Sequence, residues 1–546
     1  MDDLTALADE FYDFAMSSSP FSLMWAGKLE HLAEWDDFSR AGRAELVERM
    51  QDFADRAAAI DTTGDPQATA LRDAIASTAL SEVRGEPWTV ELQHLNPKMG
   101  AFELMLSFID NYSLATAQHG ADYLEKLRGM PAAFMQIAQV AAEAADEGVI
   151  APASHLAATA DSVARYLASP EGEEDRLAAQ APPTELSDDD KEAWKAERAE
   201  VIAHVVRPGF TTFEATLRAL ASRGMPDDRP GLVHLPGGAD VYREKIYSHL
   251  LLERTGEEIH QIGLDQIAKL EDEYREIAGP LLGTDDVSEI YAKLRDDESM
   301  KYRDAVPLIA DAELALKKAD AAAPDWFAVV PETPCLAEAT PFGPMAYYSS
   351  PDPETGKVGK FYFNTSHPEA WSTYELEAIV FHEGIPGHHL HLALNAENSA
   401  IHKVQREFHS TAYAEGWGLY TERLSDEMGL YSSQLSRVGM LSADSLRACR
   451  LVVDTGMHAL GWSREQAIQY MLDHSPMDRG HIEQEIDRYI GMPGQALAYM
   501  IGRLEIQDMR REAEAKPGFD IREFHDRFLK YGSVPLSTAR QQVLAD

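Results

Sequence analysis

The sequence of 546 residues carries 49 basic and 92 acidic side chains, which give it a formal charge of -43. A charge of this sign repels phosphate backbones and anionic lipid surfaces, so neither nucleic acid nor a membrane is an expected partner. Only two cysteines are present, Cys335 and Cys449, and they exclude a disulfide framework and a cysteine-based metal site. Any bound metal must therefore use histidine and carboxylate ligands.

The N-terminal residues are acidic and lack the basic start and apolar core of a signal peptide. No later stretch reaches the roughly 20 apolar residues that a membrane-spanning helix needs. We therefore expect a cytoplasmic protein. No pattern in the chain indicates its oligomeric state.

Most of the chain repeats apolar residues at three- and four-residue spacing, which is typical of amphipathic helices. The clearest examples are Tyr123–Gly148, Thr212–Ser222 and Glu257–Ile277. Thr255 followed by Glu258 is a capping-box pattern that opens the last of these helices, and Gly279-Pro280 is its predicted end. The sequence therefore predicts a mainly α-helical fold.

The chain is longer than one compact domain usually is, so two lobes or one large domain with a cleft are expected. We assign residues 1–230 to a helical N-terminal region that forms one wall of the cleft. Residues 231–546 form the predicted catalytic region, with metal-site helices at 373–424 and further helices after them.

One region departs from the helical pattern. Residues 343–366 contain two short runs rich in aromatic residues around a turn-rich stretch with Pro351, Pro353 and Gly356. This pattern predicts a β-hairpin just before a helix over 373–382. A free strand edge beside that helix would pair with an extended peptide. A hairpin that only packs on the core fits the pattern equally well.

Chemically active residues concentrate at 382–391, where four histidines surround Glu383. In the H-E-x-x-H zinc motif, two histidines four residues apart bind the metal, and the glutamate after the first activates the metal-bound water. Here proline occupies position 386, so the spacing differs from that motif.

Histidine nitrogens that share one zinc ion must lie about 3–3.5 Å apart. On an unbroken helix His389 would lie about 10 Å along the axis from His382, and His388 would point about 120° away. Pro386 cannot donate a hydrogen bond to the carbonyl of His382, and Gly387 is permissive. We therefore predict that Pro-Gly breaks the helix and returns one of the later histidines to the metal.

A third ligand is expected from a second helical stretch, Thr411–Tyr420, and Glu415 is the candidate. Two histidines and one glutamate leave zinc an open position for water. Glu422, two turns further along the same face, is either a carboxylate that supports a ligand or a surface residue.

Several ordered motifs resemble the bacterial domain-of-unknown-function family numbered eight hundred and eighty-five. These motifs are H-E-G-I-P-G-H-H at 382–389, Y-A-E-G-W at 413–417, D-T-G-M-H at 454–458 and R-Y-I-G-M-P-G-Q at 488–495. Leu235–Gly238 with Tyr242, and Glu257–His260, also resemble that family. The similarity spans most of the chain.

The resemblance implies a large helical metallohydrolase similar to the gluzincin peptidases, a group that includes thermolysin, thimet oligopeptidase and carboxypeptidase Taq. It selects His388 rather than His389 as the second histidine ligand. Where relatives commonly carry glutamine, this chain has His391, and a role for His389 or His391 in the site stays open.

The expected mechanism places one Zn²⁺ on His382, His388 and Glu415, with Glu383 as the general base. Mn²⁺, Co²⁺ or Ni²⁺ would suit the same ligands. The candidate donors to the developing oxyanion are His458, Arg488, Tyr489 and Tyr499. Asp454, four residues before His458, is expected to orient its imidazole.

Three functions follow from this pattern. The leading one is a zinc peptidase. The second is a metal-dependent hydrolase of a small amide or natural product. The third is a helical binding protein on a peptidase-like scaffold, against which the intact set of His382, Glu383, His388 and Glu415 argues.

Overall fold

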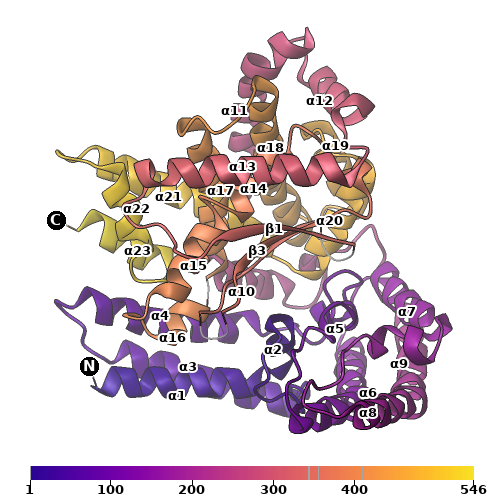
Figure 1. The fold of residues 1–546 in the computed structure, drawn as a ribbon. Coiled ribbons are helices and arrows are strands. Elements are labelled where there is room, and N and C mark those ends of the chain that lie inside the picture. The colour runs from indigo at the N-terminus through magenta and orange to yellow at the C-terminus, as the bar shows by residue number, and fades with distance from the viewer. Residues whose placement is uncertain (1, 342–344, 354–355, 409, 546) are drawn as a thin grey trace.

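The computed structural model describes residues 2–341, 345–353, 356–408 and 410–545. It is mainly α-helical, as predicted, with one small sheet (Figure 1). The first half contains helices α1 (Asp2–Ser18), α2 (Pro20–Ala26), α3 (Arg40–Ala58), α4 (Pro66–Gly85), α5 (Ala101–Phe108), α6 (Ala117–Asp146), α7 (Ala153–Ala168), α8 (Asp188–Val201), α9 (Arg207–Ala221), α10 (Gly238–Leu250) and α11 (Gly256–Leu282).

The second half adds α12 (Val287–Asp296), α13 (Ala305–Trp326), α14 (Leu376–Glu383), α15 (His388–Glu397), α16 (Lys403–Glu407), α17 (Thr411–Glu427), α18 (Gln434–His458), α19 (Arg464–His474), α20 (Arg479–Gly491), α21 (Ala498–Glu514), α22 (Ile521–Leu529) and α23 (Leu536–Leu544). Figure 1 shows the indigo and purple helices α1–α9 along one side of the molecule, below the later helices that surround the sheet.

Helix α11 shows how local sequence sets the helix ends. The predicted capping box is present, because the backbone N–H of Glu258 donates to Thr255 Oγ1 (3.1 Å) and that of Thr255 donates to Glu258 Oε2 (2.9 Å). The predicted end at Gly279-Pro280 is wrong, because the helix continues to Leu282. Gly283 ends it in the left-handed conformation (φ +72°), and its N–H donates to the carbonyl of Gly279.

The sheet contains strands β1 (Cys335–Thr340), β2 (Ala346–Ser349) and β3 (Gly359–Asn364) in the order β1-β3-β2. The antiparallel pair β2–β3 is the predicted hairpin, with Tyr347 opposite Tyr362. Residues 343–344 and 354–355 of the predicted hairpin lie outside the described residues. Strand β1 was not predicted, and it pairs in parallel with β3. Strand β2 is thus an edge strand, and it lies against α14.

Buried apolar side chains form three clusters. One lies almost entirely within residues 232–543 and surrounds the predicted metal-site helices. A second lies within residues 21–220, and a third joins α1, α3 and α4 to Val404 of α16. Contacts between α4 and α10 connect the halves of the chain, including a hydrogen bond from Ser81 Oγ to the carbonyl of Ser248 (2.7 Å). No helix within the described ranges is both long and apolar enough to cross a bilayer.

Candidate metal centre

The helix over the histidine cluster is broken where the sequence predicts. Helix α14 ends one residue after His382, and α15 begins at His388. A Cβ atom on Gly387 would lie 1.9 Å from the carbonyl oxygen of His382, so only glycine fits at this turn. The indole N–H of Trp417 donates to the carbonyl of Pro386 (3.1 Å) and ties the turn to α17.

The break brings three predicted ligands together. One ligand atom from each of His382, His388 and Glu415 lies within 4.8 Å of the others. The Nε2 atoms of His382 and His388 lie 3.5 and 3.4 Å from Glu415 Oε2. The two imidazole rings are 4.7 Å apart and nearly perpendicular (84°). Their side chains are 5% and 12% exposed, against 22% for Glu415, so the cluster opens to solvent on the carboxylate side.

Glu422 lies behind His382 and accepts from its other ring nitrogen. The distance from Glu422 Oε1 to His382 Nδ1 is 2.8 Å, and Glu422 is 1% exposed. Burial alone would lower the pKa of His382, but its hydrogen bonds to Glu415 and Glu422 outweigh burial and raise that pKa to about 9. Two carboxylates thus converge on one imidazole, an arrangement that favours positive charge at this position.

Helix α17, which carries Glu415, is held in place by close packing at two glycines. A Cβ on Gly418 would lie 2.6 Å from His382 Cε1, so the imidazole occupies the space that a side chain would fill. Next to Glu415, a Cβ on Gly416 would lie 2.6 Å from the Cα of Gly502, where α17 crosses α21. These contacts set the distance between Glu415 and the two histidines.

The donor set fits a divalent transition metal. Imidazole nitrogens and a carboxylate oxygen are the ligands that zinc uses at catalytic sites, and separations of 3.4 and 3.5 Å match atoms that share one ion. The hydrogen bond from His382 to Glu422 is the carboxylate–histidine contact that commonly orients a metal ligand.

Glu383 directly follows His382 and is partly buried. Burial raises its pKa, while His388 and His382 act in the opposite direction. Within the described residues its carboxylate forms no hydrogen bond or ion pair. Glu383 therefore keeps its acceptor oxygens available for a ligand.

The other two histidines of the cluster face elsewhere. His389 Nε2 donates to the carbonyl of Thr333 (2.9 Å), and its Nδ1 accepts from Tyr348 of β2 (2.8 Å). His391 is fully buried and bonds Ser533 Oγ through Nε2 (3.0 Å). Both stabilise the packing of α15 and lie outside the three-residue cluster.

His458, expected as an oxyanion donor, is hydrogen-bonded elsewhere in the fold. Its Nδ1 accepts from the backbone N–H of Leu232 (3.2 Å) and its Nε2 donates to the carbonyl of Tyr489 (3.1 Å), so both nitrogens are occupied. Asp454 does not orient it, because Asp454 accepts from Tyr242 Oη (2.6 Å) and from the N–H of Gly494. Burial lowers the pKa of His458 to about 4, so this imidazole is neutral at pH 7.

Arg488 and Tyr489 meet around Glu485 on α20. Two nitrogens of Arg488 donate to the Glu485 carboxylate, at 3.2 and 3.1 Å, and Tyr489 Oη donates to the same group. Arg450 of α18 completes this set, with Nε 2.7 Å from Tyr489 Oη. Arg488 and Tyr489 are thus bonded to Glu485 rather than to the three predicted ligands.

Tyr499 is the one predicted donor whose ring flanks the cluster. It stacks on His382 with a centroid separation of 6.4 Å and an interplanar angle of 23°. The guanidinium of Arg450 also packs against the Tyr499 ring, 4.5 Å from its centroid. Burial raises the pKa of Tyr499, and the charge of Glu415 acts in the same direction.

Arg447 and Arg450 of α18 were not identified from the sequence. Arg447 Nη2 lies 3.5 Å from Glu422 Oε1, and Arg450 Nη2 donates to Glu485 (2.7 Å). The sequence of α18 mixes apolar, hydroxyl and charged residues, so no pattern marks these two arginines. The fold buries the helix around most of its circumference, and a buried charge must have a partner.

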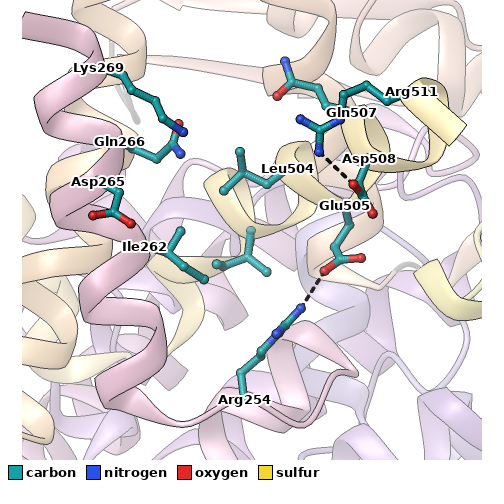
Figure 2. Close-up of a pocket in the computed structure, with 11 residues that line it drawn as sticks. Arg254, Ile262, Asp265, Gln266, Lys269, Leu504, Glu505, Gln507, Asp508 and Arg511 are labelled. Atoms are coloured by element: carbon teal, nitrogen blue, oxygen red, sulfur yellow. Dashed lines mark hydrogen bonds and ion pairs between the residues drawn. The ribbon is translucent and has the colours of Figure 1, made fainter.

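A hollow of about 120 Å³ lies beside α14 and α18 and is lined by Met345 before β2, Ile379 of α14, and Leu446 and Arg447 of α18, among others. Another, of about 340 Å³, lies between α11 and α21, where Arg254 pairs with Glu505 (Figure 2). None of the predicted site residues lines either hollow.

Comparisons with known proteins identify the family and the fold. A candidate lipoprotein from Colwellia psychrerythraea has a crystal structure that is similar with a TM-score of 0.92 and 24% identity, over 99% of this chain and 98% of that one. A candidate lipoprotein of unknown function from Shewanella oneidensis is similar with a TM-score of 0.76 and 20% identity, over 99% of both chains. No curated protein matches the chain. The family model described as bacterial protein of unknown function (DUF885) matches residues 20–543, and the chain therefore belongs to this family.

Proposed function

We propose that the protein is a zinc-dependent hydrolase that cleaves peptide bonds. The observation that carries this proposal is the convergence of His382, His388 and Glu415, with Glu383 beside them. Bound zinc would supply a Lewis acid and lower the pKa of its water from about 15.7 toward 7. Other divalent transition metals would serve the same ligands.

The chain's own residues would carry the remaining steps. Glu383 takes the proton of the attacking water and passes it to the leaving amine. Glu422 holds His382 in one orientation through the 2.8 Å hydrogen bond to Nδ1. Tyr499, next to His382, would face the developing charge on the carbonyl oxygen.

Strand β2 gives this proposal a way to hold a peptide. Its partner strand β3 lies on one side, and the other edge of β2 has no strand partner among the described residues. Backbone hydrogen bonds to that edge would hold an extended segment in register, independently of its side chains. Because β2 lies against α14, the segment would pass the end of the helix that carries His382 and Glu383.

The test compares Glu383→Gln with a matched control, Glu377→Gln, on the same helix. Each protein is loaded with zinc, its metal content is measured, and a mixed peptide library is analysed by mass spectrometry after incubation. We expect about one ion per chain in both variants and a loss of most activity in Glu383→Gln alone. A fully active Glu383→Gln variant would refute the role of Glu383, and failure of the unmodified protein to bind zinc would refute the metal site.

Hydrolysis of a small amide is the second candidate. The hollow along α14, the helix that carries His382 and Glu383, measures only about 120 Å³, which is small against the roughly 300–1,000 Å³ of most ligand pockets and so favours a small substrate. The same library separates the two functions, because a zinc-loaded protein that cleaves no peptide but hydrolyses acyl amino acids would support the second.

A further inference from the structure

The buried arginines of α18 present hydrogen-bond donors that the protein itself does not use. Arg450 is 6% exposed, and although its Nε and Nη2 donate to Tyr489 and Glu485, its buried Nη1 has no partner among the described residues. Nε of Arg447, one helical turn earlier, is likewise buried and unpaired. An unpaired charged donor in the interior is costly, so a ligand that accepts from it would be bound strongly.

Three arginines share few carboxylate partners here. Arg450 and Arg488 both donate to the single carboxylate of Glu485. Arg447 pairs with Glu422, which also accepts from His382, and donates to the carbonyl of Ala443. The three guanidinium groups thus have two carboxylate partners among the described residues, which suits one added monovalent anion better than a phosphate group of higher charge.

The position of the arginines relates this anion to the proposed reaction. The ring of Tyr499 stacks on His382 and also contacts the Arg450 guanidinium, so one aromatic ring separates Arg450 from the cluster. Each residue of an extended peptide spans about 3.3–3.6 Å. An anion at Arg450 would therefore lie within one or two residues of a bond held at the cluster.

The small hollow connects Arg447 to the start of strand β2. It is lined by Arg447, by Met345 directly before β2, and by Ile379 on α14. Ile379 lies one helical turn before Glu383 and so shares its face of the helix. A peptide that pairs with β2 would therefore run along α14 toward Arg447.

From these contacts we infer that Arg447 and Arg450 bind the C-terminal carboxylate of a peptide, so that the enzyme removes one or two residues from that end. The planar guanidinium groups would accommodate a carboxylate, and Tyr499 would form the wall between the carboxylate and the scissile bond. This inference rests on the proposed peptidase function and names its substrate class.

The binding arm of the test does not depend on turnover. Zinc-loaded Glu383→Gln protein is immobilised and offered a pentapeptide library with free C-termini and the same library with C-terminal amides, and retained peptides are measured by mass spectrometry. We expect free carboxylates to be retained about 10- to 100-fold better, the range set by one charged hydrogen bond. Equal retention of the two libraries, including none of either, would overturn the inference.

The variants identify the residues responsible. Adding Arg450→Gln or Arg447→Gln should remove the preference for free carboxylates while the zinc content stays at one ion per chain. If Arg450→Gln fails to fold, Arg447→Gln still allows the measurement of retained peptides. Arg447 bonds only a backbone carbonyl and Glu422 among the described residues, so its replacement should disturb folding less. Arg437→Gln, on the same helix but paired with Asp426, is the matched control and should keep the preference. A preference that survives both site variants contradicts the assignment.

The cleavage arm separates this inference from the function on which it rests. The unmodified zinc protein should release single residues or dipeptides from free C-termini and leave amidated peptides largely intact. Cleavage of both libraries at internal bonds would overturn the inference and keep the peptidase. Cleavage of neither library would overturn the peptidase, whatever the binding arm gives.

Discussion

At the scale of single residues, the site depends on how His382 is held. Its Nε2 faces Glu415 and its Nδ1 is bonded to the fully buried Glu422. The sequence indicated Glu422 as a possible support for a ligand because it lies two turns after Glu415. In the structure, the 2.8 Å hydrogen bond between His382 Nδ1 and Glu422 Oε1 is the contact through which Glu422 would support the ligand.

Glu422→Gln should weaken zinc binding about 10- to 100-fold, since a neutral amide accepts from His382 less strongly than a carboxylate does. Competition with a chelator of known affinity measures the change. Glu427→Gln, on the same helix but paired with Arg510 at the surface, serves as the control and should bind zinc normally. Equal zinc affinity in the two variants would contradict the proposed support.

His458 provides a pH prediction that also tests its expected role as an oxyanion donor. Its pKa is lowered to about 4 in the folded protein, against about 6.5 when unfolded, so the unfolded state takes up the proton first as the pH falls. The stability that it contributes is thus complete above pH 6.5 and is lost on going down toward pH 4. The total loss should be about 3 kcal/mol.

His458→Gln should remove most of this pH dependence, because glutamine can accept from Leu232 and donate to the carbonyl of Tyr489 without titrating. Urea unfolding at pH 7 and pH 5 of both proteins gives the comparison. The variant should also retain most activity per bound zinc ion. A collapse of kcat with stability unchanged would restore His458 to the catalytic set.

At the scale of elements, the break between α14 and α15 decides whether the ligands meet. Gly387→Ala would place a methyl group 1.9 Å from the carbonyl of His382 and so displace His388. We expect zinc affinity to fall by at least about tenfold, because loss of a group that orients a metal ligand typically has an effect of this size. Gly64→Ala, where a Cβ meets nothing within 4 Å, should cost stability only. Undiminished zinc binding by Gly387→Ala would show that the turn can shift freely.

The break was predictable because proline and glycine act locally on the backbone. The hairpin was predictable for the same reason, from its turn residues. Strand β1 was missed because Cys335–Thr340 consists largely of residues common in helices, and its parallel pairing with β3 joins segments that are distant in sequence. The four-residue spacing on a helix suggested that Asp454 orients His458. In the structure, His458 accepts from the N–H of Leu232 and Asp454 accepts from the N–H of Gly494, and only the fold brings these residues near. Arg447 and Arg450 belong to no local motif.

At the scale of the whole molecule, the fold class and the family are settled, whereas several expectations stay predictions. These are the division of the chain at residue 230 with its cleft, the cytoplasmic location, and a peptide or small amide as the partner in place of nucleic acid or membrane. The acidic surface is the property of the whole chain that can be tested most directly.

Added salt should stabilise the protein, because a formal charge of -43 makes the folded state repel itself. Raising the ionic strength from 0.01 to 0.1 M shortens the screening length from about 30 to about 10 Å. The thermal unfolding midpoint should therefore rise, as measured by calorimetry with metal content held fixed. A fall would mean that surface ion pairs, such as those of Arg540 with Asp508 and Glu512, outweigh the net repulsion.

The crossing of α17 and α21 at Gly416 and Gly502 bears on how quickly a metal ion would enter the proposed site. Backbone meets backbone there, so Glu415 and the helix that carries Tyr499 move as one body. Uptake of a metal ion would then require no rearrangement of helices. Its rate would be limited by loss of water from the ion and by collision with the Glu415 side chain, which is 22% exposed. Loading should accordingly follow second-order kinetics, linear in metal concentration, without the plateau that a slow opening step would impose.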